Sequence, residues 1–258
     1  MPEFLATNFS RSLTRAEEYI AGKLKRKNLP IISRFELFHA VWEMYEYAQN
    51  QKLYLRGSLP SEDDFRRIRR GLLAGGIISN DPDYGSSVLR VLTVSDMPAD
   101  NIVCLADTTC YISHISAMQR WGLTNRMPKA LHITRPDRSK AKDLLSQKME
   151  QICSDGEVNP FKLSYINHPG KVRGRSLTVS SSKIFGRYLR TRDDNVRLST
   201  IGQTFIDTID KPNLCGGMAH VLDVWKEYAP QYLQKIIETV DLDERPIIKC
   251  RAGYIVEE

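Results

Sequence analysis

The sequence predicts an α+β protein built from two domains. Helical periodicity, each time behind a capping residue, recurs three times in the first 75 residues. A pair of apolar strand patterns follows directly, and strands and helices are mixed from there to the C-terminus. The balance of charge shifts near residue 96, so we expect one domain at 1–95 and a second at 96–258.

The first two helices are marked by capping boxes, in which a hydroxyl and a carboxylate three residues later bond each other's backbone N–H groups. Thr14 and Glu17 open a helix that extends to about residue 27. Ser33 and Glu36 open a second helix that extends to about residue 49. Aromatic side chains recur along the second helix, and we expect them in the core.

A third helix is predicted at 61–74, where Ser61 can cap the first free N–H groups and Asp64 takes the second capping-box position. Phe65, Ile68 and Leu72 recur at helical spacing, so they form one buried face. Three arginines project from the other side of this helix: Arg66, Arg67 and Arg70.

A hairpin follows the third helix. Gly75 and Gly76 stop the helix, residues 77–78 begin a strand, and an apolar strand returns at 88–94 after a turn-rich segment. Three helices followed by a two-stranded ribbon form the order of a winged helix-turn-helix, whose third helix enters the DNA major groove. The alternative interpretation is a solvated amphipathic helix beside an ordinary hairpin.

The winged-helix interpretation predicts a set of DNA contacts. The arginines of the third helix would read guanine edges or pair with phosphates, because a guanidinium suits both. Ser61 would lie near a phosphate at the start of that helix. The ribbon would add contacts from Tyr84, Ser86, Ser87 and Arg90.

The second domain is expected to be mixed α/β. Helices are predicted at 113–121, 139–152 and 201–209, and two further helices at 218–228 and 230–240. Strands are predicted at 130–134, 161–167, 176–180 and 185–192, and the tail at 247–256 has a mixed pattern.

The residue inventory favours no catalytic, cofactor or metal site. The five cysteines are widely spaced without a C-x-x-C pair, and the five histidines lack metal-ligand spacing. Ser113, His114 and Ser116 are sequence neighbours, which rarely provide a nucleophile with a correctly placed base. No apolar run approaches the ~18–20 residues that span a bilayer, and no signal-peptide pattern opens the chain, so we expect a cytoplasmic protein.

Charge is distributed unevenly along the chain. The net charge is +6, yet residues 198–258 carry −4 and the excess of basic groups precedes them. A basic protein tends to bind polyanions. The stretch 171–197 is a candidate for additional nucleic-acid contact or for shielding RNA, with a solvated strand face as the alternative; its candidate residues are Lys171, Arg173, Arg175, Arg187 and Arg190.

Two blocks of the second domain resemble the AbiEi antitoxin family. Residues 111–124 read YISHISAMQRWGLT, similar to that family's Y-[IV]-S-x-x-S-A-L-x-x-[HW]-G-L-T. Residues 197–207 read RLSTIGQTFID, similar to R-[VL]-S-x-x-x-x-T-[LF]-[IL]-D, and residues 211–217 resemble the P-x-L-[CA]-G-G that follows. An N-terminal winged helix is also the family's arrangement. The second helix and the loop before Ser61 look longer than is usual in the family.

The resemblance implies an antitoxin of a type IV toxin–antitoxin pair, linked to abortive infection and phage defence. Such a protein represses its own promoter by binding double-stranded DNA at inverted repeats, which favours paired copies on DNA. Its functional partner would be a nucleotidyltransferase-like AbiEii toxin, and the second domain would be the antitoxin domain. Two other classes stay open: an interaction protein that neutralises its toxin by direct contact, through the acidic C-terminal quarter, and an enzyme that reverses the toxin's modification.

Overall fold

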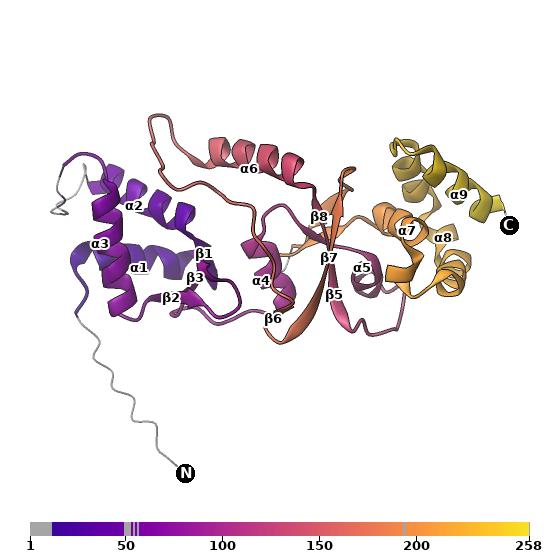
Figure 1. Cartoon of the computed structure of the whole chain (residues 1–258), viewed down its shortest axis with the longest axis horizontal. Coiled ribbons are helices and arrows are strands. Elements are labelled where there is room, and N and C mark those ends of the chain that lie inside the picture. Colours follow the sequence, from indigo (N-terminus) through magenta and orange to yellow (C-terminus); the bar gives the residue numbers. More distant parts are fainter. Residues whose placement is uncertain (1–11, 49–52, 54, 56, 193–194, 258) are drawn as a thin grey trace, which may run out of the picture. The chain divides into compact units, whose positions relative to one another are not determined.

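The computed structural model describes residues 12–48, 53, 55, 57–192 and 195–257. The chain is a mixed α+β protein, as expected, with two separate sheets among the described residues. It divides into two compact units (Figure 1): unit 1 comprises residues 1–97 and 146–164, and unit 2 comprises residues 98–145 and 165–258. Residues 146–164, which the sequence assigned to the second domain, therefore belong to unit 1.

Up to residue 97, the described part of unit 1 consists of three helices and a three-stranded antiparallel sheet. The elements in chain order are α1 (Arg15–Lys27), β1 (Ile31–Ser33), α2 (Arg34–Ala48), α3 (Glu62–Ala74), β2 (Ile78–Asp81) and β3 (Gly85–Val91). β3 is the central strand, with β1 on one side and β2 on the other. The sheet therefore joins the strand before α2 to the hairpin that follows α3.

The three predicted capping boxes are confirmed. At the start of α1, the Thr14 hydroxyl accepts a hydrogen bond from the Glu17 N–H, and the Glu17 carboxylate accepts one from the Thr14 N–H. Ser33 and Glu36 make the same exchange at α2, at 2.9 and 3.1 Å. Because each box satisfies donors that a helix leaves free at its first turn, these helices begin where the sequence predicts.

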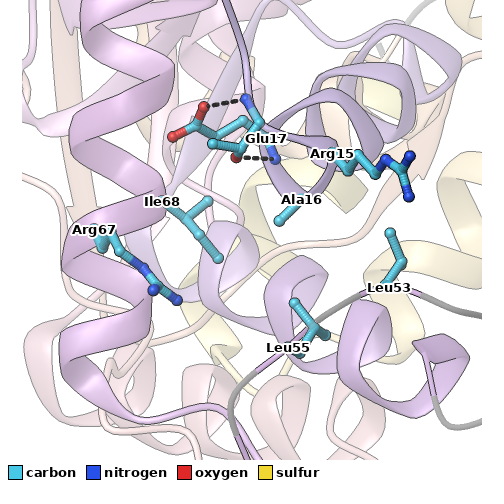
Figure 2. Close-up of a pocket in the computed structure, with 8 residues that line it drawn as sticks. Arg15, Ala16, Glu17, Leu53, Leu55, Arg67 and Ile68 are labelled. Atoms are coloured by element: carbon cyan, nitrogen blue, oxygen red, sulfur yellow. Dashed lines mark hydrogen bonds between the residues drawn. The ribbon is translucent and has the colours of Figure 1, made fainter.

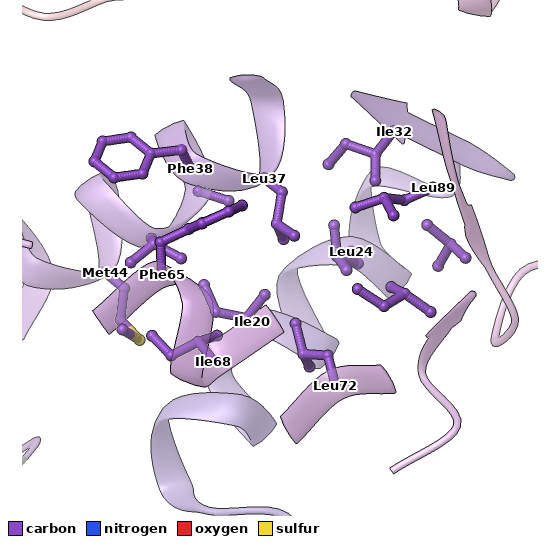
Figure 3. Packing of buried hydrophobic residues seen from close by; sticks show 14 of the residues in the cluster. Ile20, Leu24, Ile32, Leu37, Phe38, Met44, Phe65, Ile68, Leu72 and Leu89 are labelled. Atoms are coloured by element: carbon purple, nitrogen blue, oxygen red, sulfur yellow. The ribbon is translucent and has the colours of Figure 1, made fainter. Parts of the chain in front are cut away.

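The core of unit 1 lies between the three helices and the sheet (Figure 3). Buried apolar side chains from every element fill it, among them Ile20, Leu24, Ile32, Leu37, Phe38, Phe65, Ile68, Leu72 and Leu89. Burying one large aliphatic or aromatic side chain contributes about 1.5–3 kcal/mol. This packing holds α3 by its predicted apolar face and fixes which side of that helix meets solvent.

Segment 146–164 completes the core of unit 1. The Phe161 ring lies 4.5 Å from the Phe65 ring and 5.7 Å from the Phe38 ring, measured between centroids. His39 Nδ1 lies 2.7 Å from a carboxylate oxygen of Glu157. The expected strand at 161–167 is wrong, because these residues are irregular and pair with no strand, and Phe161 packs on α2 and α3 instead.

Unit 2 is organised around a six-stranded mixed sheet. Its strands are β4 (Tyr111–Ile112), β5 (Ala130–Pro136), β6 (Lys171–Val172), β7 (Arg175–Ser182), β8 (Tyr188–Arg190) and β9 (Arg197–Ser199). The strand order is β6-β7-β5-β4-β9-β8, so β6 and β8 form opposite edges. The β5–β7 and β4–β9 pairs are parallel, and the other pairs are antiparallel.

Helices follow or flank these strands. Three helices precede β6 in the chain: α4 (Ala99–Ala106), α5 (His114–Arg120) and α6 (Arg138–Ile152). The division between the two units falls inside α6. The C-terminal part contains α7 (Ile201–Asp210), the short 3₁₀ turn η1 (Pro212–Cys215), α8 (Met218–Asp241) and α9 (Pro246–Glu257). Phe205 of α7 and Trp225 of α8 meet edge to face at 5.2 Å in the core of this part.

Two expectations about the C-terminal helices are wrong. Residues 218–241 form one helix that passes through Pro230, not two helices separated by it. Proline costs a helix interior about 3 kcal/mol, but residues buried on both sides of Pro230, including Val224, Trp225 and Ile236, anchor both parts of the helix, so it continues through the proline. The mixed pattern of the tail is the helix α9, whose buried residues are Ile248 and Ala252.

Candidate nucleic-acid interface

α3 begins at a saturated cap. The Ser61 hydroxyl accepts a hydrogen bond from the Asp64 N–H at 3.2 Å and donates one to the Asp64 carboxylate at 2.7 Å. Partial burial works against ionisation of Asp64, but the bonds from Ser61 outweigh it and lower the pKa of that carboxyl. Ser61 is exposed at the expected helix end, and its hydroxyl is engaged within the helix.

The three predicted contact arginines of α3 face solvent. The Arg66 side chain is 63% exposed and the Arg67 side chain 55% exposed, and Arg70 is exposed as well. Arg69 behaves differently: it is half-buried, and its Nε has no hydrogen-bond partner among the described residues. Burial, and then the nearby Arg34 cation, lower the pKa of its guanidinium. The exposed arginines therefore form one cationic side of α3.

Ion pairs within α3 hold two of these arginines in place. Arg66 lies 2.8 Å from the Glu62 carboxylate and 3.6 Å from that of Asp63, and Arg67 lies 2.7 Å from Asp64. Exposed pairs of this spacing contribute only about 0.3–0.5 kcal/mol each. A phosphate offers a guanidinium a stronger, two-point bond, so these pairs orient the arginines without competing strongly against a polyanion.

A hollow of about 330 Å³ lies beside Arg67, between the start of α1, α3 and the side chains of Leu53 and Leu55 (Figure 2). Arg15 of α1 and Arg67 of α3 both line it, together with the apolar side chains of Ala16, Leu53, Leu55 and Ile68. Nothing in the sequence around Arg15 indicated this position, because the packing of α1 against α3 decides it. Arg15 extends the cationic side of α3 toward α1.

The hairpin after α3 has a tightly bonded tip. A carboxylate oxygen of Asp81 accepts hydrogen bonds from the N–H groups of Asp83 and Tyr84, each at 3.0 Å. Ser86 and Ser87, at the start of β3, are exposed as a wing contact requires. Tyr84 was expected at the surface of the wing, but the structure buries it.

Arg90 also lies elsewhere than its predicted role requires. Its guanidinium donates hydrogen bonds to the carbonyls of Pro30 and Val94, each at 2.7 Å, and to that of Val91. Only 12% of the side chain is exposed. Because backbone carbonyls already take these donors, Arg90 ties β3 to its neighbouring segments and offers no free donor fork to a phosphate.

The basic stretch 171–197 does not form one continuous patch. Lys171 and Arg175 lie on β6 and β7 at one edge of the sheet of unit 2, with Arg173 in the turn between them, whereas Arg187 and Arg190 lie at or next to β8 on the opposite edge. Neighbouring strands are about 4.8 Å apart, so the two edges lie on the order of 24 Å from each other. Lys171, Arg187 and Arg190 are exposed, and Arg173 and Arg175 are half-buried.

The two family-like blocks of unit 2 meet inside the sheet. Residues 111–124 and 197–207 begin on β4 and β9, which pair as parallel strands with Ile112 opposite Leu198. The buried Arg197 guanidinium donates to the carbonyls of Cys104, Asp107 and Cys110, at 2.7, 2.5 and 2.6 Å. Arg197 is thus an internal brace that closes the loop between α4 and β4 onto the sheet.

A buried chain of polar side chains adjoins this brace. Thr134 donates its hydroxyl hydrogen to Ser113 at 2.8 Å, and Ser113 Oγ lies 2.7 Å from His114 Nδ1. Burial lowers the pKa of His114 to about 3, so its imidazole is neutral. Ser113 is completely buried, which leaves its hydroxyl out of reach of a substrate. The Ser113 side chain makes no capping hydrogen bond to α5 and instead links Thr134 to His114.

Asp207 is the buried carboxyl of the second block. One oxygen accepts a hydrogen bond from Gln203 Nε2 at 2.8 Å, and the other has no hydrogen-bond partner among the described residues. Burial, aided by the nearby Asp210, raises the pKa of Asp207 to about 7. This carboxyl consequently changes its charge near neutral pH inside the core of unit 2.

One group of potential metal ligands is present among the described residues. Oxygen, sulfur and nitrogen atoms of Asp107, Cys110 and His168 lie within 4.8 Å of one another. Arg135 already approaches the Asp107 carboxylate at 3.1 Å, and His168 does so at 3.0 Å. Burial opposes ionisation of Asp107, but the bond from His168 and the Arg135 charge keep its pKa low. An ion pair thus satisfies this carboxylate without a metal.

Among the residues that the structure describes, none of the helices combines the length and apolarity that crossing a bilayer demands. No family model and no curated protein matches the chain. Among solved structures, it is similar to the RV2827C protein from Mycobacterium tuberculosis, with 12% identity and a TM-score of 0.45 over 96% of this chain and 78% of that one. At this degree of similarity, nothing about activity or partners transfers to the present chain.

Proposed function

We propose that this protein is a DNA-binding antitoxin that represses its own promoter, with unit 1 as a winged helix-turn-helix. One observation carries the proposal: α3 turns Arg66, Arg67 and Arg70 to solvent and leads directly into the β2–β3 hairpin. The element order α1-β1-α2-α3-β2-β3 and the sheet order β1-β3-β2 match what a reading helix supported by a wing needs.

In the proposed complex, α3 enters the major groove with its arginine side. Ser61 has no part in the contact as now proposed, because Asp64 already engages its hydroxyl and the three carboxylates of the first turn of α3 repel a phosphate there. The hairpin contributes Ser86 and Ser87 to the flanking backbone. Tyr84 and Arg90 have no part in the contact as now proposed, because Tyr84 is buried and Arg90 bonds to backbone carbonyls.

The choice of antitoxin rests on the family-like blocks at 111–124 and 197–207. They imply an operator of inverted repeats, two copies on the DNA and a nucleotidyltransferase-like toxin as functional partner. Unit 2 would then act as the antitoxin domain. Buried hydrogen bonds of Arg197 and of Ser113 tie its segments together, which suits a domain that presents a fixed surface to a partner.

A binding series on the duplex upstream of the gene tests the proposal. The Arg66/Arg67/Arg70→Ala variant should lose at least about 100-fold in affinity, because each lost base or phosphate contact costs roughly 1–3 kcal/mol. The matched control removes three charges from exposed positions at or near the β8 edge of unit 2, which the contact as now proposed leaves out, as Arg187/Arg190/Arg192→Ala. The control should stay within about threefold of the wild type.

Two results would contradict the proposed interface. Unchanged binding by the α3 variant would reject α3 as the reading helix. Equal losses by the two variants would show that total charge, and not the side of α3, governs the affinity. A circular dichroism spectrum identical to the wild type is the control for folding, and it is expected because all three α3 side chains lie outside the core.

A further inference from the structure

The C-terminal helices leave an apolar stripe uncovered. Met218, Leu222, Leu233 and Ile237 are each between 37% and 47% exposed. At about 100° per residue they fall within an arc of about 100° of α8, so they form two apolar pairs on the same side of that helix, with Lys226 between them. Their neighbours on one side, including Val221 and Trp225, are buried. Single exposed apolar residues are ordinary, but an aligned set marks an interaction surface.

Two residues of this stripe, Leu222 and Leu233, line a groove. Leu222, Trp225, Ala229 and Leu233 of α8 line it, and Ile255 and Val256 of α9 form its other wall. The volume is about 510 Å³. A groove walled by two helices and lined by apolar side chains is the form that accepts the apolar face of a third helix, with anchors at i, i+3 or i+4, and i+7.

A row of carboxylates borders the stripe on its outer side. Asp223, Glu227, Glu238 and Asp241 are all exposed on α8. Helical geometry puts them within about 60° of one another, directly beside the arc that the apolar stripe occupies. Lys226 lies in the groove lining itself, where its aliphatic stem can cover apolar surface while its ammonium reaches water. The α8 side of the α8–α9 groove is therefore bordered by acidic groups.

We propose that the α8–α9 groove binds an amphipathic helix of a partner protein, with apolar anchors flanked by lysines or arginines. The apolar anchors would bury the stripe, and the basic flank would lie along the carboxylate row, which gives orientation and rate as well as affinity. A second copy of this chain fits less well, because a two-fold contact would bring two acidic rows together. An anionic membrane surface meets the same repulsion. The proposal is independent of DNA binding by α3.

Two synthetic helical peptides provide the test on the full-length chain. One carries a leucine face flanked by lysines, and the other carries the same leucine face flanked by glutamates. Fluorescence anisotropy should give at least about tenfold tighter binding of the lysine peptide, with a difference that shrinks as salt rises. Equal binding of the two peptides would overturn the assigned partner class.

Three variants locate the binding. Leu222→Asn combined with Leu233→Asn should weaken binding of the lysine peptide at least tenfold, whereas Met127→Asn, at an exposed apolar residue that does not line the groove, should leave it unchanged. Lys226→Glu should tighten it several-fold, a gain that misfolding cannot produce. Insensitivity to Leu222, Leu233 and Lys226 would overturn the proposal, and so would a stable dimer in sedimentation that the Leu222/Leu233 variant abolishes.

Discussion

The third helix of unit 1 and the strand β9 of unit 2 use arginine in opposite ways. In unit 1, α3 turns Arg66 and Arg67 outward and holds them with carboxylates of its own first turn. In unit 2, the guanidinium of Arg197 is buried and donates to three backbone carbonyls of one loop. An exposed guanidinium is available to a ligand, whereas the donors of a buried one are taken by backbone carbonyls and stabilise the fold. The residue type alone therefore does not indicate which role an arginine has.

The same contrast separates the sequence blocks from the candidate contacts. The sequence blocks at 111–124 and 197–207 of unit 2 contain positions, such as Ser113, Arg197 and Asp207, that are buried and bond within the unit. The positions proposed to contact DNA lie on the surface of unit 1, where the resemblance is weak. The blocks thus identify a fold interior, and the contacts depend on a surface that the blocks do not encode.

Loss of the buried brace should have the largest effect. Arg197→Met keeps the stem of the side chain but leaves buried carbonyls without donors, at about 1–3 kcal/mol each, so unit 2 should lose about 3 kcal/mol or more. Arg190→Met, directly opposite Arg197 on β8 but exposed, is the matched control and should change stability by less than about 0.5 kcal/mol.

Urea unfolding in a Trp42→Phe background measures this difference. Trp42 belongs to unit 1, so the remaining Trp121 and Trp225 report on unit 2 alone. Equal midpoints for the Arg197 and Arg190 variants would contradict the brace.

The sequence predicted those structural features whose signals lie within a few neighbouring residues. The capping boxes at Thr14, Ser33 and Ser61 lie within four residues, and the buried face of α3 is a periodicity, so both were predictable. The bonds of Arg90 to backbone carbonyls could not be predicted. Its partner Pro30 is 60 residues away in sequence, and only the pairing of β1 with β3 brings the two residues together.

Three other features could not be predicted from the sequence, because they too depend on contacts between residues that are distant along the chain. The alternation at 161–167 indicates a strand, but Phe161 packs on helices of unit 1. Pro230 indicates a helix end, but tertiary packing carries α8 through it. The basic stretch 171–197 reads as one cluster, but the strand order sends its two ends to opposite edges of the sheet.

The buried carboxyl should make unit 2 sensitive to pH. The pKa of Asp207 is raised to about 7 in the folded state, against about 3.9 in an unfolded chain. The folded state then holds the proton more tightly, so this stabilisation is fully present below about pH 4 and is lost as the pH rises through 7. The loss is about 1.4 kcal/mol per pH unit in that window.

Asp207→Asn should remove this slope, because the amide cannot ionise. Asp223→Asn, at an exposed carboxyl of α8, is the control and should keep it. Unfolding free energies measured between pH 4 and 8 in the Trp42→Phe background give the comparison. Parallel curves for the wild type and the Asp207 variant would refute the burial argument.

Close helix crossings should give a smaller effect. A Cβ on Gly202 would lie 2.4 Å from the backbone carbonyl oxygen of Lys235, so Gly202→Ala should cost unit 2 about 1–3 kcal/mol. A Cβ on Gly71 would meet only the Glu17 side chain, which can shift by giving up its capping bond to Thr14. Gly71→Ala should therefore destabilise unit 1 by only about 1 kcal/mol, the usual cost of a lost capping bond.

Gly253→Ala on α9 supplies the control, because its Cβ would meet nothing within 4 Å. That variant should be unchanged or more stable by up to about 1 kcal/mol, since alanine favours helix. Thermal unfolding ranks the three variants, and a larger loss for Gly71→Ala than for Gly202→Ala would reverse the comparison.

The salt dependence of binding to the upstream duplex tests most directly which unit holds the DNA. Each phosphate contact contributes about 0.9 to the slope of log affinity against log salt concentration. The Arg66/Arg67/Arg70→Ala variant should show a slope shallower than the wild type by roughly 2–3, while Arg187/Arg190/Arg192→Ala should keep the wild-type slope. A wild-type slope for the α3 variant together with a shallower one for the unit 2 variant would contradict the account.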